Sequence, residues 1–163
     1  MADPEGSLGG RCACGEVRYR LRGRPFAVHC CHCRDCQRET GSAFVINGLI
    51  ETPQVEVTHG EPETILTPSA SGKGQRIVRC PTCAVALWSH YGGMGEKAAF
   101  VRMGTLDHPD ACPPQVHIFA RSKQPWFELP MDAPAFEIFY NRDDLDTLFG
   151  QGGARRWRTL RER

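Results

Sequence analysis

The sequence has no excess of charge of either sign and no long hydrophobic run. Twenty Lys and Arg residues are balanced by 19 Asp and Glu residues, which gives a formal net charge of +1. A near-neutral chain has no electrostatic reason to bind nucleic acid or an anionic membrane surface. No segment approaches the roughly 20 apolar residues of a membrane-spanning helix, and the N-terminus lacks the basic start and apolar run of a secretory signal. We therefore expect a cytoplasmic protein, or a nuclear one, that does not enter the membrane.

The composition is that of one folded domain. Of the 163 residues, 40% are hydrophobic and 24% are charged, which is far from the composition of a disordered chain. We expect residues 1–9 to be a flexible N-terminus and residues 10–149 to form the domain. Residues 150–163 read GQGGARRWRTLRER and are expected to be a flexible basic tail, the one segment suited to nucleic acid or a partner protein.

Short alternating runs dominate the domain. Val17, Tyr19 and Leu21 alternate with charged residues, which is typical of a half-buried strand. Seven further runs have strand-like composition and are separated by turn residues: 43–46, 55–58, 76–79, 85–89, 100–103, 116–120 and 136–139. Eight short strands predict an all-β fold, a sandwich, barrel or tent.

Helix is expected in only two places. One turn is predicted at 34–40, and a short helix at 142–149. Asn141 is a suitable N-cap for the second helix, and Gly150 stands just past its end.

The nine cysteines fall mostly into three spaced groups. In a reducing compartment such groups are more often metal ligands than disulfides. The groups are Cys12-x-Cys14, Cys31-x-Cys33-x2-Cys36 and Cys80-x2-Cys83. Zinc takes four tetrahedral ligands, and a tight turn supplies two of them. The first and third groups together therefore predict a closed, structural four-cysteine zinc site.

The middle group is left with three ligands. Three protein ligands and an open fourth position are typical of a catalytic zinc, because water or a substrate thiol can occupy the open position. Cys33 and Cys36 are three residues apart and lie on one side of a helical turn, while Cys31 reaches in from the strand end. The sequence therefore predicts two Zn²⁺ per chain.

Other cysteine and histidine residues adjoin the middle group. Cys30 points away from Cys31 in an extended segment, so it is either a buried spare thiol or a redox or ligand residue. His32 also points away from the predicted metal and either supports the site or contacts substrate. His29 is an alternative fourth ligand, which would close the site and make it structural.

These motifs resemble those of a known family. Cys12-Ala13-Cys14-Gly15, Cys31-His32-Cys33-Arg34-Asp35-Cys36 with Gly41-Ser42-Ala43-Phe44, and Cys80-Pro81-Thr82-Cys83 are similar to the glutathione-dependent formaldehyde-activating enzyme family, which includes the centromere protein V domain. Gly104–Asp107, His117–Lys123 and Trp126 resemble the later part of the family pattern, so the resemblance covers roughly residues 10–138.

The resemblance implies a fold and assigns each group of cysteines to one of two zinc sites. It implies a β-tent-like fold of antiparallel sheets held by zinc. It also implies that Cys12, Cys14, Cys80 and Cys83 bind the structural zinc, and that Cys31, Cys33 and Cys36 bind the catalytic zinc. One position departs from the pattern: Ala84 follows the last cysteine where the family commonly has glycine. Because glycine permits a positive φ there, alanine predicts a different turn or some strain.

The activity implied by the resemblance is formation of S-hydroxymethylglutathione from formaldehyde and glutathione, a carbon-sulfur lyase reaction without a redox cofactor. Glutathione, the co-substrate, carries two carboxylates that basic side chains can bind. The candidates are Arg34, Arg38, Arg121 and Lys123, with Ser42 and Trp126 as pocket walls. His117, which alternates with Ile118 in a predicted strand, is expected in the core or a pocket wall.

Two other functions fit the sequence. One is a zinc-stabilised binding module without turnover, acting through the basic tail. The other is an enzyme resembling methionine sulfoxide reductases, which also have paired CxxC zinc ligands. That reaction needs a nucleophilic cysteine late in the chain, and Cys112, in a Pro-rich segment, is the one available.

Overall fold

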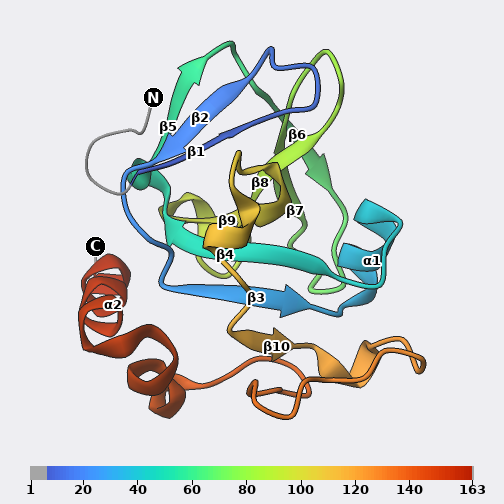
Figure 1. The fold of residues 1–163 in the computed structure, drawn as a ribbon, viewed down its shortest axis with the longest axis vertical. Helices are drawn as coiled ribbons and strands as arrows, with labels where there is room; N and C mark the ends of the chain where they lie inside the picture. Colours follow the sequence, from blue (N-terminus) through green and yellow to red (C-terminus); the bar gives the residue numbers. More distant parts are fainter. Residues whose placement is uncertain (1–6, 163) are drawn as a thin grey trace.

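The computed structural model describes residues 7–162, which are mostly β-sheet (Figure 1). The strands are β1 (Leu8–Arg11), β2 (Arg18–Leu21), β3 (Ala27–Cys31), β4 (Val45–Glu51), β5 (Val55–His59), β6 (Glu63–Thr67), β7 (Gln75–Arg79), β8 (Ala86–Tyr91), β9 (Ala98–Arg102) and β10 (Val116–Ile118). They form a small sheet of order β1-β2-β5 and a seven-stranded sheet of order β10-β3-β4-β9-β8-β7-β6. The pairing of β10 with β3 is parallel, and the other strand pairs are antiparallel.

The helices are few, and most are single turns. The α-helices are α1 (Arg34–Thr40) and α2 (Leu145–Glu162). The 3-10 turns are η1 (Thr52–Gln54), η2 (Gly95–Lys97), η3 (Met103–Thr105), η4 (Pro109–Ala111), η5 (Ala120–Ser122) and η6 (Arg142–Asp144). Within residues 7–162, neither α-helix is long and apolar enough to cross a bilayer.

The large sheet carries apolar side chains on both faces. On one face it packs against the small sheet, where the rings of Tyr19 and Trp88 meet edge to face with centroids 5.7 Å apart. On the other face it packs against the C-terminal part of the chain, where Phe26 contacts Phe149 and Trp157. The large sheet is therefore the middle layer, and β3 runs through it between two hydrophobic clusters.

The strand predictions hold where alternation was clear. Val17, Tyr19 and Leu21 are buried together, which confirms the first strand. The predictions at 55–58, 76–79, 85–89 and 100–103 overlap β5, β7, β8 and β9, whereas those at 43–46 and 116–120 only partly match β4 and β10. The strand expected at 136–139 is wrong, because this segment bonds irregularly to residues 117–121, and the nearby isolated bridge is made by Ala135, just before it, to His117.

Three strands escaped prediction: β1, β3 and β6. All five residues of β3 are buried, including His29. A strand covered on both faces has no alternation by which it can be recognised.

The C-terminal segment corrects the expectation of a flexible tail. Asn141, the predicted N-cap, caps the 3-10 turn η6 that leads into α2, through a capping box with Asp144, and Gly150 has a φ of 66°. The helix then resumes through Glu162. Ala154 and Trp157 are buried, so the spacing of apolar residues among the arginines ties this segment to the sheet.

The expected flexible N-terminus is also shorter than predicted. Leu8 and Gly9 belong to β1 and pair with Leu21 and Arg20 of β2. Residues 1–6 of that prediction lie outside the described residues.

Candidate metal centres and the groove beside them

The first and third cysteine groups meet in space. Cys12 and Cys14 lie in the turn between β1 and β2, and Cys80 and Cys83 lie in the turn between β7 and β8. The four sulfurs lie within 4.8 Å of one another, with 3.5 Å between Cys12 and Cys14 and 3.7 Å between Cys14 and Cys80. Sulfurs about 2.3 Å from a tetrahedral zinc are about 3.8 Å apart. The four-cysteine cluster therefore has the dimensions of a zinc shell.

Backbone amides around this cluster favour negatively charged sulfur. The Val17 N–H donates to Cys12 Sγ at 3.3 Å, and the Cys83 N–H donates to Cys80 Sγ at 3.5 Å. Backbone hydrogen bonds from Cys14 and Val85 lower the pKa of Cys83 to about 6. Hydrogen bonds to the charged form of an acid stabilise that form, and the thiolate is the form that binds metal.

Both turns of the four-cysteine cluster use a left-handed residue. Gly15 has a φ of 78° and Ala84 has a φ of 59°. The alanine thus keeps the backbone for which glycine is suited, at a cost of about 1–2 kcal/mol. The Ala84 N–H donates to the Cys80 carbonyl at 2.9 Å and closes the turn. The predicted departure at Ala84 is therefore strain in the turn and not a different turn.

The middle cysteine group forms a second cluster at the junction of β3 and α1. The sulfurs of Cys31, Cys33 and Cys36 lie within 4.8 Å of one another, with 3.6 Å between those of Cys31 and Cys36. Cys33 is the N-cap of α1, and its sulfur accepts from the Cys36 N–H at 3.3 Å. Hydrogen bonds from Cys31 and Cys36 lower the pKa of Cys33 to about 3. Hydrogen bonds with Cys33 and Cys36 raise the pKa of Cys31, so negative charge in this cluster is held first on Cys33.

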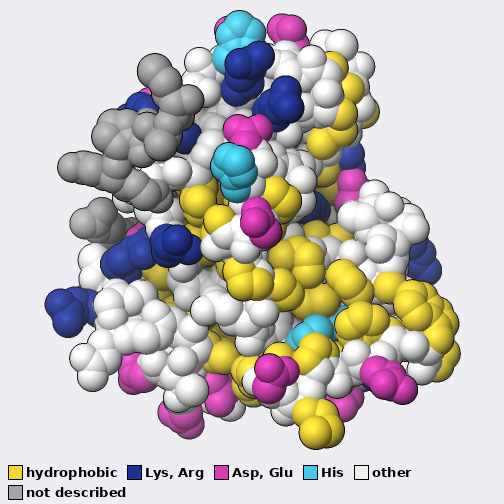
Figure 2. All heavy atoms as spheres, in the orientation of Figure 1, with side chains coloured by type: hydrophobic (Ala, Val, Ile, Leu, Met, Phe, Trp, Pro, Cys, Tyr) yellow, Lys and Arg dark blue, Asp and Glu magenta, His cyan; other side chains and the backbone are white. Residues whose placement is uncertain are grey.

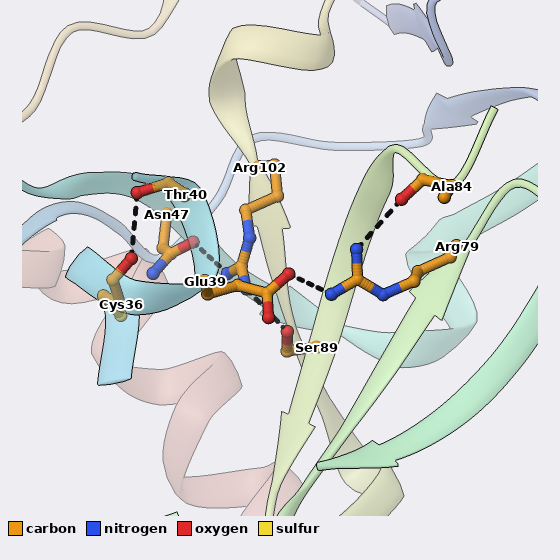
Figure 3. A network of polar contacts seen from close by, with 8 residues as sticks. All are labelled: Cys36, Glu39, Thr40, Asn47, Arg79, Ala84, Ser89 and Arg102. Atoms are coloured by element: carbon orange, nitrogen blue, oxygen red, sulfur yellow. Dashed lines mark hydrogen bonds and ion pairs between the residues drawn. The ribbon is translucent and has the colours of Figure 1, made fainter. Parts of the chain in front are cut away.

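A buried arginine, Arg102, lies near Cys36 of the three-cysteine cluster (Figure 3). Arg102 is 6% exposed and donates to Asn47 Oδ1 at 2.6 Å and to Ser89 Oγ at 2.9 Å. Both partners are neutral, and no carboxylate forms an ion pair with Arg102 within residues 7–162. Arg102 interacts electrostatically with the Cys36 thiol. Because a buried cation needs an anion nearby, the cluster is its natural counter-charge.

A tyrosine hydroxyl also faces the three-cysteine cluster. Tyr91 Oη lies 3.9 Å from Cys36 Sγ. Burial raises the pKa of Tyr91 well above its ordinary value, so the hydroxyl keeps its proton at neutral pH and can donate it in a hydrogen bond. Sequence reasoning missed both Arg102 and Tyr91, which carry no local signal.

The two clusters are tied together by an ion pair (Figure 3). Glu39, on α1, pairs with Arg79, whose side chain is 18% exposed. Arg79 Nη1 also donates to the Ala84 carbonyl at 2.9 Å, at the turn that holds Cys80. The helix that carries Cys36 is therefore anchored to the four-cysteine cluster.

Cys30 and His32 point away from the three-cysteine cluster, as the alternation of the extended chain predicted. Cys30 Sγ lies 3.6 Å from His32 Nε2, which lies 2.9 Å from His117 Nδ1. These three side chains are buried and form a third group of potential ligands. His29 joins none of the groups, because its Nε2 lies 2.7 Å from the Tyr140 hydroxyl.

A groove of about 710 Å³ begins where α1 ends. It is lined by residues 41–44 and by Gln124, Trp126 and Phe127. Ser42 and Trp126, both predicted pocket residues, are thus brought together. On the face seen in Figure 2, hydrophobic side chains gather over β10 and the segment that follows it, in which Trp126 is 71% exposed.

The predicted basic residues do not line this groove. Arg38 is exposed, and its Nη1 lies 4.0 Å from Asp35 Oδ1. Arg121 is exposed, and Arg34 donates to the Gln37 side chain at 2.8 Å. Lys123 Nζ donates to the carbonyl of Phe127 at 2.9 Å and so holds the loop that forms one wall.

Gln37 connects the three-cysteine helix to that loop. Its Nε2 donates to the His32 carbonyl at 2.7 Å and to the Ser122 carbonyl at 3.0 Å. Its Oε1 accepts from Gln124 Nε2 at 2.8 Å. A buried glutamine among cysteines has no pattern by which the sequence could have revealed this role.

The fold and its sulfur clusters define a cysteine-rich β protein with sites suited to metal. The family model described as glutathione-dependent formaldehyde-activating enzyme matches residues 7–122, and the chain belongs to this family. Among solved structures, the crystal structure of a Rhodobacter sphaeroides protein, a structural genomics target, matches with a TM-score of 0.47 and 19% identity, covering 61% of this chain and 87% of that one. No curated protein matches the chain.

Proposed function

We propose that the protein is a zinc-dependent, carbon-sulfur lyase-like enzyme that acts on a small thiol adduct, such as the S-hydroxymethylglutathione formed from glutathione and formaldehyde. The observation that carries the proposal is the three-cysteine cluster, which has a buried arginine and a protonated tyrosine hydroxyl beside it. Family membership supports the same chemistry.

The proposal includes two Zn²⁺ per chain. Cys12, Cys14, Cys80 and Cys83 would hold the structural ion, and Cys31, Cys33 and Cys36 the catalytic one. Three thiolates and one divalent ion leave one net negative charge, which Arg102 balances. When bound at the three-cysteine cluster, zinc supplies positive charge that favours the thiolate form of a substrate thiol.

Residues beside the three-cysteine cluster are proposed to stabilise the charge that develops on the substrate oxygen. In the forming direction a carbon-sulfur bond is made, the carbonyl π bond of formaldehyde breaks, and the thiol proton ends on the oxygen. Tyr91 keeps its own proton and donates a hydrogen bond to that oxygen while negative charge develops on it. Arg102 adds positive potential at the same place. In the lyase direction the same contacts assist the reverse step.

The groove at the end of α1 is the proposed site for the body of glutathione. Trp126 and Phe127 offer apolar surface, and Ser42 and Gln124 offer polar atoms. Arg38 and Arg121 are exposed, and we propose that they bind the two carboxylates of glutathione. Lys123 contributes by holding the Phe127 carbonyl and thus the wall itself.

The arrangement of the sheets and the cellular compartment are also part of the proposal. We expect the two sheets to have the β-tent arrangement of the family. None of the nine cysteines is in a disulfide, which supports work in a reducing compartment, the cytoplasm or the nucleus.

The two alternative functions receive less support. Of the four arginines at 151–162, Arg156 pairs with Glu51 of β4, so this segment is engaged with the sheet, and Arg158 pairs with Asp146 within α2. Cys112 is buried, and burial raises its pKa, which disfavours the thiolate that methionine sulfoxide reduction needs.

The test is the substitution Cys36→Ser. We expect zinc content to fall by about one ion per chain, the circular dichroism spectrum to be retained, and catalysed exchange between free glutathione and its formaldehyde adduct to be lost. Exchange NMR measures the rate of this exchange. The rate without protein is the background that is subtracted. Cys112→Ser is the control and should keep both zinc and turnover. Full turnover in Cys36→Ser would overturn the proposal.

A further inference from the structure

A third cluster of potential ligands lies on the opposite side of the β3 segment from Cys31. Cys30 is on β3, His32 follows the end of the strand, and His117 is on β10. The parallel pairing of β10 with β3 sets His117 directly beside Cys30. The three residues are 1%, 0% and 4% exposed. Strand register thus brings together two residues from one motif and one that is 85 positions further along the chain.

The donor atoms of this cluster converge on one point. Cys30 Sγ, His32 Nε2 and His117 Nδ1 all lie within 4.8 Å of one another. The Sγ to Nε2 distance is 3.6 Å and the Nε2 to Nδ1 distance is 2.9 Å. In a tetrahedral zinc shell, sulfur and nitrogen ligands are about 3.5 Å apart and two nitrogens about 3.3 Å apart. Both printed distances are therefore within a few tenths of an ångström of the zinc-shell values, and three of the four ligand positions would be filled.

His32 Nε2 faces both the thiol and the other imidazole. A ring nitrogen has one proton or one in-plane lone pair, so a hydrogen bond pairs it with one of these neighbours, whereas a shared metal ion would be bound by all three side chains. Two imidazoles and one thiolate are ligands that suit zinc.

The cluster opens on a cavity that shares Phe44 and Phe127 with the groove at the end of α1. Cys30 and His117 line a cavity of about 380 Å³, together with Phe44, Phe127 and Asp132. The rings of Phe44 and Phe127 pack on His32 with centroids 5.5 and 5.3 Å away. The site thus has an apolar wall and a route for an ion and a further small ligand.

We infer that Cys30, His32 and His117 form a third zinc site, with three protein ligands and an open position towards this cavity. It shares no ligand with the three-cysteine cluster, because Cys30 and Cys31 lie on opposite faces of β3. The inference does not depend on the proposed lyase activity. It assigns a role to Cys30, which neither of the two cysteine clusters uses.

The experiment is a zinc count on the purified, folded protein after equilibrium dialysis against buffered Zn²⁺. The Cys30→Ala variant is compared with Cys112→Ala, since both remove a buried thiol, and only Cys30 belongs to a ligand cluster. We expect Cys30→Ala to bind about one zinc fewer than the wild-type protein and Cys112→Ala to bind the same number. His117→Gln removes a ligand from the other strand and should show the same loss.

A double variant distinguishes the third site from the three-cysteine site. Cys36→Ser together with Cys30→Ala should lose two ions if the sites are separate. Cobalt provides a second readout, because the wild-type spectrum minus that of folded Cys30→Ala or His117→Gln should contain thiolate-to-cobalt charge transfer. Wild-type zinc counts and cobalt spectra in both folded variants would overturn the inference, whatever the result of the turnover assay.

Discussion

The four-cysteine and three-cysteine clusters differ in the span of chain that supplies their ligands. The four-cysteine cluster joins the turn between β1 and β2 of the small sheet to the turn between β7 and β8 of the large one. The three-cysteine cluster takes all its ligands from residues 31–36, and Arg102 and Tyr91 surround it. A cluster that links two sheets stabilises tertiary structure. A cluster whose ligands all come from six consecutive residues does not join distant parts of the chain, which suits the catalytic role proposed for it.

The largest effect is expected from Cys80→Ser, which would break the link between the sheets. Structural zinc contributes about 10 kcal/mol to the folding of small metal modules, so this variant should be largely unfolded by circular dichroism. Cys33→Ser removes a ligand from the other cluster but keeps an N-cap for α1, because serine caps helices well. It should remain folded. Equal losses of structure in the two variants would contradict the distinction.

The grouping of the cysteines was predictable because ligand spacing is local. Two cysteines in a tight turn supply neighbouring sulfurs whatever the rest of the fold. Because a zinc shell needs four ligands, the two cysteines at 12–14 could be matched with the two at 80–83. The helical turn at 34–40 and the Asn141 cap follow from equally local rules. These parts of the structure needed no knowledge of which strands are neighbours.

The contacts that depend on strand order could not be predicted. His117 meets His32 only because β10 pairs with β3, and Arg102 reaches Asn47 only because β9 pairs with β4. The C-terminal helix was misjudged because its arginines dominate the composition. Its stability comes from Trp157 against Phe26, a contact that the tail sequence alone does not contain.

Arg102→Met tests the charge beside the three-cysteine cluster. Methionine keeps much of the buried volume but removes the cation and leaves Asn47 and Ser89 without their donor. We expect a loss of about 3 kcal/mol in the free energy of unfolding. We also expect faster transfer of zinc from the three-cysteine cluster to a chelator, with the slower release from the four-cysteine cluster unchanged. An unaltered rate of zinc release from the three-cysteine cluster would argue against Arg102 as the counter-charge.

Glu39→Gln tests the ion pair that joins the clusters. The pair is mostly buried, since the side chains of Glu39 and Arg79 are 12% and 18% exposed. Its loss should cost about 2 kcal/mol, between the values for surface and fully buried pairs. A double-mutant cycle with Arg79→Met, followed by urea unfolding, isolates the coupling. Additive losses would mean that α1 is not held by this contact.

Ala84→Gly should have the smallest effect and the opposite sign. Relief of the left-handed alanine gains about 1–2 kcal/mol, while the greater freedom of glycine in the unfolded chain costs about 0.5–1 kcal/mol. The variant should thus be slightly more stable in thermal unfolding. Gly15→Ala is the matched control at the other turn, because a Cβ there would meet only Arg18 Nη2, at 3.9 Å. That change should destabilise through φ alone. If both variants lose stability, the position after Cys83 needs its methyl group more than it needs a relaxed backbone, and strain does not explain the departure at Ala84.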